Sequence, residues 1–160
     1  MIAAPDRPRD RTIGSLVREA LWFLFHTAVA IGLVIAIITV MTLNHPDPDS
    51  AGPKVTLTVL AFLMPMFAGL IASRMQHNSN ARHIWISGLV LFTIACVWVL
   101  DLPTGKGLCE NCGSVEKVWR TIFSFSHGSG LMSGDGPLIG AWMPLSMISY
   151  AFGARFGLEP

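Results

Sequence analysis

Charged residues are scarce in this sequence, and their scarcity excludes several classes of protein. Asp, Glu, Lys and Arg make up 13% of the 160 residues, whereas soluble domains carry roughly 25%. The net charge is +1, and no stripe of Lys and Arg with interleaved aromatic residues occurs, so we expect no nucleic-acid partner. Hydrophobic residues make up 52% of the chain, and they are gathered in long blocks. This balance predicts an all-α integral membrane protein surrounded by lipid.

The sequence also has few of the residues that catalysis and metal binding require. No charged residue lies near the middle of an apolar block, which argues against a proton relay. His26 and His83 could ligate a haem only if both rings faced inward at one depth, and we expect His83 to anchor its helix at the membrane surface and His26 to be structural. We therefore expect no catalytic residue, no metal and no cofactor.

Four blocks contain no Asp, Glu, Lys or Arg and predict four transmembrane helices. A helix over the first block is about 36 Å long at 1.5 Å per residue, more than the roughly 30 Å of a hydrocarbon core. Pro65 interrupts the second block and predicts a kink whose freed carbonyl is satisfied by a neighbouring helix. The predicted segments are a tail at 1–19, spans at 20–43, 55–73, 84–100 and 137–153, a loop at 101–136 and an end segment at 154–160.

The distribution of basic residues predicts the orientation of these spans. Most basic residues of the polar segments fall on one side, at Arg7, Arg9, Arg11, Arg18, Arg74, Arg82 and Arg155. The other side holds Lys54, Lys106, Lys117 and Arg120. Because basic residues concentrate on the cytoplasmic side, we expect both termini in the cytoplasm and the loop at 101–136 outside a bacterial inner (plasma) membrane.

A CxxC pair, Cys109 and Cys112, lies in this outer loop. In an oxidising compartment two such thiols form a structural disulfide or a thiol-redox pair. A zinc site would need two further ligands, for which only His127 and a carboxylate such as Glu110 or Glu116 are near. We expect the structural disulfide and leave the redox pair as the alternative.

A short amphipathic helix is predicted after the CxxC. Apolar residues recur there at helical spacing, while Glu116, Lys117 and Arg120 occupy other faces of the same turns. With a Trp at its centre, we expect this helix to lie at the outer membrane interface with its apolar face toward lipid, or else to cover the mouth of the bundle. The apolar residues are Val115, Val118, Trp119, Ile122 and Phe123.

Small residues within the spans predict close helix packing. Glycines let helix backbones approach one another, either within the bundle or against another membrane protein. We therefore expect a packing or partner face, with the lipid bilayer and other membrane subunits or a second copy of the chain as partners. The residues assigned to this face are Pro65, Gly69, Gly88, Gly140, Trp142 and Pro144.

Residues 60–155 resemble the last three membrane helices of the LptF/LptG permeases, the membrane subunits of the lipopolysaccharide exporter. Phe62-Leu63-Met64-Pro65-Met66-Phe67 with Gly69 is similar to a helix with an apolar-Pro-apolar stretch before a short basic loop. The span from Trp85 to Asp101 resembles the next helix, and Gly136-Pro137-Leu138-Ile139-Gly140-Ala141-Trp142-Met143-Pro144 resembles the closing helix. In that family, three helices and a periplasmic β-domain precede these three, whereas here the single span at 20–43 precedes them.

The resemblance implies a non-enzymatic, permease-like membrane subunit in lipid or lipopolysaccharide transport, which is our first hypothesis. The second is a quinone-linked thiol-disulfide oxidoreductase of the DsbB type, which also has four spans and an outward CxxC. That type carries its CxxC in the first outward loop, where this chain has no Cys. The third hypothesis is an accessory subunit of a respiratory membrane complex.

Overall fold

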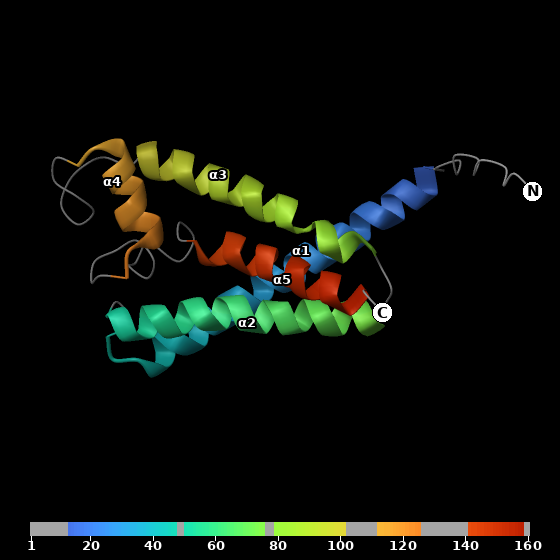
Figure 1. Ribbon diagram of the computed structural model, residues 1–160, viewed down its shortest axis with the longest axis horizontal. Coiled ribbons are helices and arrows are strands. Elements are labelled where there is room, and N and C mark those ends of the chain that lie inside the picture. Colours follow the sequence, from blue (N-terminus) through green and yellow to red (C-terminus); the bar gives the residue numbers. More distant parts are fainter. Residues whose placement is uncertain (1–12, 48–49, 76–78, 102–111, 126–140, 159–160) are drawn as a thin grey trace, which may run out of the picture.

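The computed structural model describes residues 13–47, 50–75, 79–101, 112–125 and 141–158, and these residues are almost entirely helical (Figure 1). No strand occurs among them, so the prediction of an all-α chain is confirmed for this part of the sequence. The elements are α1 (Ile13–Asn44), α2 (Ala51–Met75), the 3-10 helix η1 (Ser79–His83), α3 (Trp85–Asp101), α4 (Ser114–Val118), the π-helical turn η2 (Trp119–Phe123) and α5 (Trp142–Leu158).

Three helical segments are long and apolar enough to cross a membrane: Ile13–Asn44, Ala51–Met75 and Asn80–Asp101. The last combines most of η1 with α3. Pro65 lies inside α2 without ending it. α5 has 17 residues, which gives a length of about 26 Å. It begins at Trp142 and continues past Gly153 to Leu158, while residues 137–140 of the expected fourth span lie outside the described part of the chain.

α5 is the central helix of the bundle, although its sequence is the least continuously apolar of the four long helices. It packs along α2 on one side and α3 on the other, and it also contacts α1 and η1. Figure 1 shows α5 between α2 and α3. Its large side chains Trp142, Met147 and Tyr150 are fully buried. The small and polar residues of α5 are thus placed in the interior of the bundle, where small residues allow helices to approach closely.

Glycines and serines set the close approach of α2 and α5. A Cβ on Gly69 would lie 2.1 Å from the Tyr150 carbonyl oxygen, and one on Gly153 would lie 1.9 Å from the Met66 carbonyl oxygen. Neither helix could carry a larger side chain at these positions without separating from the other. The buried positions of α2 recur every fourth residue from Leu57 through Ala61, Pro65 and Gly69 to Ser73, the spacing of small-residue interfaces in membranes.

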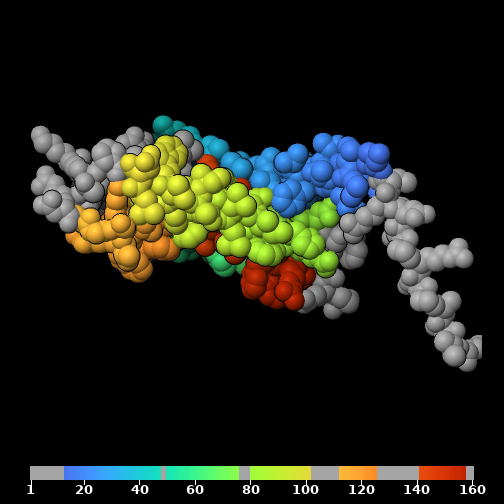
Figure 2. All heavy atoms as spheres, turned by 90° about the horizontal axis from the view of Figure 1, so that it is seen from above, coloured from blue at the N-terminus to red at the C-terminus, as the bar shows by residue number. Residues whose placement is uncertain are grey.

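The two ends of the bundle differ in what they bring together. At one end, Asn80 Nδ2 donates a 3.1 Å hydrogen bond to the Glu19 carbonyl oxygen, and Gly157 lies against Ser73, so the start of α1, the end of α2, η1 and the end of α5 meet. At the other end, α4 and η2 lie across the end of α3 (Figure 1). Figure 2 shows α3 and the α4–η2 segment as one continuous surface at this end of the elongated molecule.

Candidate functional site

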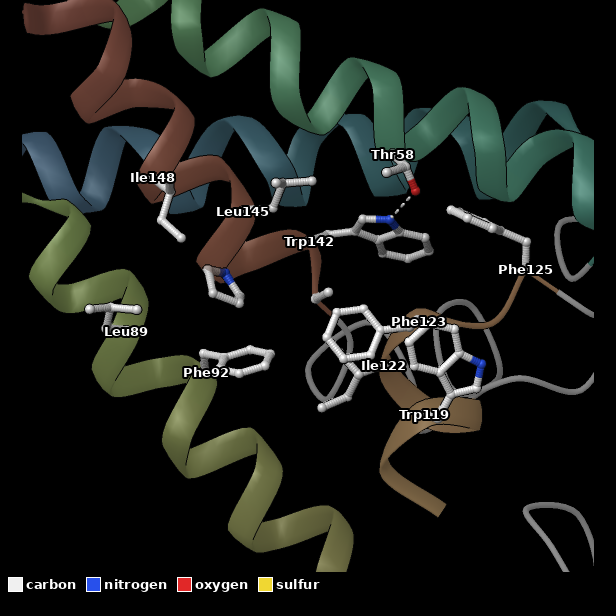
Figure 3. Close-up of a pocket in the computed structure, with 12 residues that line it drawn as sticks. Thr58, Leu89, Phe92, Trp119, Ile122, Phe123, Phe125, Trp142, Leu145 and Ile148 are labelled. Carbon is white, nitrogen blue, oxygen red and sulfur yellow. Dashed lines mark hydrogen bonds between the residues drawn. The ribbon is translucent and has the colours of Figure 1, made fainter. Parts of the chain in front are cut away.

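An apolar pocket of about 670 Å³ lies between α2, α3, α5 and the α4–η2 segment (Figure 3). This volume is within the range of cavities that bind small organic molecules. Several lining side chains, including Leu89, Phe123 and Ile148, are substantially exposed, so the pocket is open along one side. Its walls are formed by Thr58, Leu89, Phe92, Trp119, Ile122, Phe123, Phe125, Ala141, Trp142, Pro144, Leu145 and Ile148.

The pocket lies beside the first turn of α5, at a level well inside α2. Trp142, the first residue of α5, is level with Thr58, and its indole Nε1 donates a 2.9 Å hydrogen bond to the Thr58 hydroxyl (Figure 3). Thr58 is about two turns into α2, whose first residue is Ala51. α3 runs alongside on the far side of α5, and the side chains of Phe92 and Ile122 line the space in front of the first turn of α5.

Thr58 supplies the only side-chain hydroxyl among the lining residues that the structure describes. This hydroxyl donates a 2.8 Å hydrogen bond to the Lys54 carbonyl oxygen and accepts the Trp142 N–H. Its donor is therefore already used within the protein. A ligand in this pocket meets mainly apolar and aromatic carbon, and the one further side-chain donor among the described lining residues is the indole N–H of Trp119, which is 62% exposed.

A buried lysine connects the α4–η2 segment to the end of α3. Lys117 is buried, and its Nζ donates a 3.2 Å hydrogen bond to the Leu100 carbonyl oxygen. Leu100 belongs to the last turn of α3, where the carbonyls have no intrahelical partner, and a cation is favoured at a helix C-terminus. The contact holds α4 across the end of α3, where η2 forms one wall of the pocket.

The five apolar residues of the predicted interfacial helix lie on α4 and η2, but some of them are buried against the bundle and the others are exposed. Ile122 is buried and Val118 is half-buried against the bundle, whereas Val115, Trp119 and Phe123 are 85%, 62% and 44% exposed. The Glu116–Arg120 ion pair, 3.0 Å between its nitrogen and oxygen, occupies a separate exposed face. Contact of the exposed apolar residues with lipid stays a prediction.

The residues predicted for a packing or partner face lie within the bundle. Pro65, Gly69, Gly88, Trp142 and Pro144 are all buried between helices of the same chain. A Cβ on Gly88, for example, would lie 3.0 Å from the Pro144 carbonyl oxygen. The structure therefore uses these five residues for internal packing, and they are not accessible to another subunit. The sixth, Gly140, lies outside the described residues.

The carbonyls near Pro65 receive a partner from α5. Pro65 cannot donate to the Ala61 carbonyl, and the Ser149 hydroxyl of α5 donates instead to the adjacent Phe62 carbonyl oxygen. The sequence predicted that a neighbouring helix would satisfy the freed Ala61 carbonyl, and this stays a prediction because the recorded hydrogen bond goes to Phe62. Ser149 is not among the residues predicted for helix packing, although its spacing from Gly153 and Gly157 marks a small-residue stripe.

His26 and Tyr150 form a buried polar contact between α1 and α5. His26 Nδ1 and the Tyr150 hydroxyl lie 2.7 Å apart, and His26 is 2% exposed. Its Nε2 and the Thr27 hydroxyl are buried with no hydrogen-bond partner among the described residues. His83 is exposed, so the two histidines do not face a common interior site. A structural role for His26 fits its place between two helices.

The described cysteines and acidic residues form no recognisable metal site. No group of three or more His, Cys, Asp or Glu side chains able to hold a metal occurs in the described part of the chain. Cys96 is a free, half-buried thiol within α3. Cys112 lies just before α4, but Cys109 lies outside the described residues, so the disulfide between them stays a prediction.

Comparison with known proteins finds no match for this chain. No family model, no curated protein and no solved structure matches the chain.

Proposed function

We propose that this chain is a non-enzymatic, permease-like membrane subunit that binds a hydrocarbon chain of a membrane lipid in the pocket between α3, α5 and η2. The observation that carries the proposal is a pocket of about 670 Å³ with apolar walls, placed at the surface of helices suited to a membrane. A hydrocarbon chain that enters the pocket would exchange contact with other lipid tails for contact with fixed aromatic rings. We also propose that the protein uses this pocket in lipid or lipopolysaccharide transport, the role that the sequence resemblance implies.

The pocket chemistry favours a hydrocarbon chain over a quinone. A quinone headgroup carries two carbonyl oxygens, and a binding site normally supplies hydrogen-bond donors to at least one of them. The Thr58 hydroxyl already donates to the Lys54 carbonyl, and the Trp142 N–H already donates to Thr58. The remaining side-chain donor among the described lining residues is the indole N–H of the exposed Trp119. A quinone in this pocket would have to rely on this one exposed donor, so the pocket fits a hydrocarbon chain better than it fits the quinone that the thiol-oxidoreductase alternative requires.

We further propose four spans with both termini in the cytoplasm of a bacterium. α5 runs along α2 and α3 and ends beside Ser73, which supports treating it as the fourth span despite its length. Arg74, Arg82 and Arg155 are exposed near the bundle end where α2, η1 and α5 meet, and the positive-inside rule makes this end cytoplasmic. Reporter fusions after Leu158 and after Asn44 test it: a cytoplasmic reporter should be active only at the first position.

The lipid proposal is tested by filling the pocket from α3. Leu89 lines the pocket, and a Leu89→Trp variant would occupy part of its volume. Ile94 lies on the same helix, is similarly exposed and does not line the pocket, so Ile94→Trp is the matched control. The purified variants would be exposed to a diazirine-labelled palmitic acid, illuminated, and digested to locate the labelled peptides.

We expect labelled peptides from α3, α5 and η2 in the starting protein and in Ile94→Trp. Leu89→Trp should lose about four-fifths or more of this labelling, because displacing even two methylenes from an apolar site costs roughly 1.6 kcal/mol. If Leu89→Trp is labelled as strongly as Ile94→Trp, the pocket does not bind a hydrocarbon chain and the proposed function fails.

A further inference from the structure

A second apolar hollow, of about 340 Å³, shares two lining residues with the first. Trp119 and Phe123 belong to both sets of lining residues. Their ring centroids are 5.3 Å apart with an interplanar angle of 33°, so they form one aromatic wall, which we call the aromatic ridge. The remaining residues of the small hollow are Leu100, Ser114, Val115 and Val118.

The two hollows lie at different depths along α3. The small hollow reaches Leu100, in the last turn of α3. The large pocket reaches Leu89, three turns further into the bundle. Both are reached from the aromatic ridge, whose side chains are largely exposed. A molecule lying over the ridge could therefore extend apolar groups into both hollows at once.

The chemistry around the ridge limits what such a molecule can be. Among the described residues of the small hollow, Ser114 on the exposed first turn of α4 supplies the one hydroxyl, and Trp119 adds an indole N–H. The Glu116–Arg120 ion pair is exposed on the same segment, and Arg120 directly follows Trp119 of the ridge. A molecule with two apolar arms and a polar group where they join would fit the two apolar hollows and the charged pair beside them.

We infer that the lipid bound by this protein is a two-chain glycerophospholipid that straddles the aromatic ridge. One acyl chain enters the pocket of Leu89 and Ile148, and part of the other enters the hollow of Leu100 and Val118. The junction of the chains lies over Trp119, with the headgroup beside the charged face of α4–η2. The inference rests on the proposed function, and it adds the number of acyl chains in the bound lipid and the hollow that each acyl chain enters.

The test compares a two-chain probe with a one-chain probe in variants of each hollow. Val118→Trp fills the small hollow, and Val115→Trp, at a more exposed position of the same hollow, is a second variant in case the first does not fold. Leu89→Trp fills the large pocket, and Ile94→Trp remains the control. The probes are diazirine-labelled phosphatidylethanolamine with two acyl chains and diazirine-labelled palmitic acid, each applied to the purified full chain, with size-exclusion chromatography to verify folding.

Filling the small hollow should lower labelling by the two-chain lipid about fivefold and leave labelling by palmitic acid unchanged, because only the former loses buried methylenes. Leu89→Trp should lower both. If folded Val118→Trp and Val115→Trp variants bind the two-chain lipid as well as the control does, the inference is overturned while the one-chain pocket stands. If Leu89→Trp changes neither probe, the proposed function itself is wrong.

Discussion

Replacement of Gly153 by alanine tests the packing on which the pocket depends. The new Cβ would lie 1.9 Å from the Met66 carbonyl oxygen and 2.7 Å from the carbonyl carbon. Ordinary contacts of this kind begin near 3.4 Å, so α2 and α5 must separate by about 1.5 Å. Both colliding atoms are backbone, so no change of side-chain rotamer can relieve the contact.

The cost can be estimated from two terms. Forcing a methyl group into a packed interface costs about 1–3 kcal/mol. Separation of the helices also stretches the hydrogen bond from Ser149 to the Phe62 carbonyl, and an interhelical hydrogen bond in a membrane is worth about 0.6 kcal/mol. We therefore expect the steric effect to lower the free energy of unfolding by roughly 2–3 kcal/mol.

Gly32→Ala is the matched control. Gly32 is also within a long helix, but a Cβ there meets no atom within 4 Å. Both substitutions gain the same helix propensity, about 1 kcal/mol, so this gain cancels when the two variants are compared. The measurement is reversible unfolding in mixed micelles of dodecyl maltoside and sodium dodecyl sulfate, followed by tryptophan fluorescence. If Gly153→Ala unfolds at the same detergent fraction as Gly32→Ala, the proposed contact between α2 and α5 is wrong.

Three further predictions concern individual side-chain contacts, two of them hydrogen bonds and one a disulfide. Trp142→Phe removes the donor to Thr58 and should lower the free energy of unfolding by about 0.5–1.5 kcal/mol, measured in the same micelles; an unchanged value would contradict the contact. Tyr150→Phe leaves His26 Nδ1 buried without its partner and should cost about 1–3 kcal/mol. His26→Leu combined with Tyr150→Phe should cost less than the sum of the two single changes, and strict additivity would argue against a direct bond. Thiol labelling of intact cells should find Cys109 and Cys112 oxidised, since we expect a disulfide in an outer loop; rapid labelling without reductant would place the loop in the cytoplasm or leave the thiols unpaired.

The long helices and their membrane character could be predicted from the sequence. Uncharged blocks of this length can satisfy their backbone hydrogen bonds in lipid only as helices, and Ile13–Asn44, Ala51–Met75 and Asn80–Asp101 have the expected length and hydropathy. The amphipathic segment was also predictable, because its apolar residues recur at helical spacing. These properties are local, since each depends on the composition and order of residues within one segment.

The arrangement of the helices was decided by tertiary contacts. The weakest apolar block became the central helix α5, because its Ser149, Gly153 and Gly157 allow backbone approach that larger side chains would block. Pro65, Gly69 and Trp142, which the sequence equally allowed to face a partner, are buried within the chain. The pocket depends on where Trp142 meets Thr58 and on where Lys117 holds α4 against Leu100. Such relations join residues distant in the chain, so no local pattern encodes them; composition determined that helices form, and shape complementarity between them determined the site.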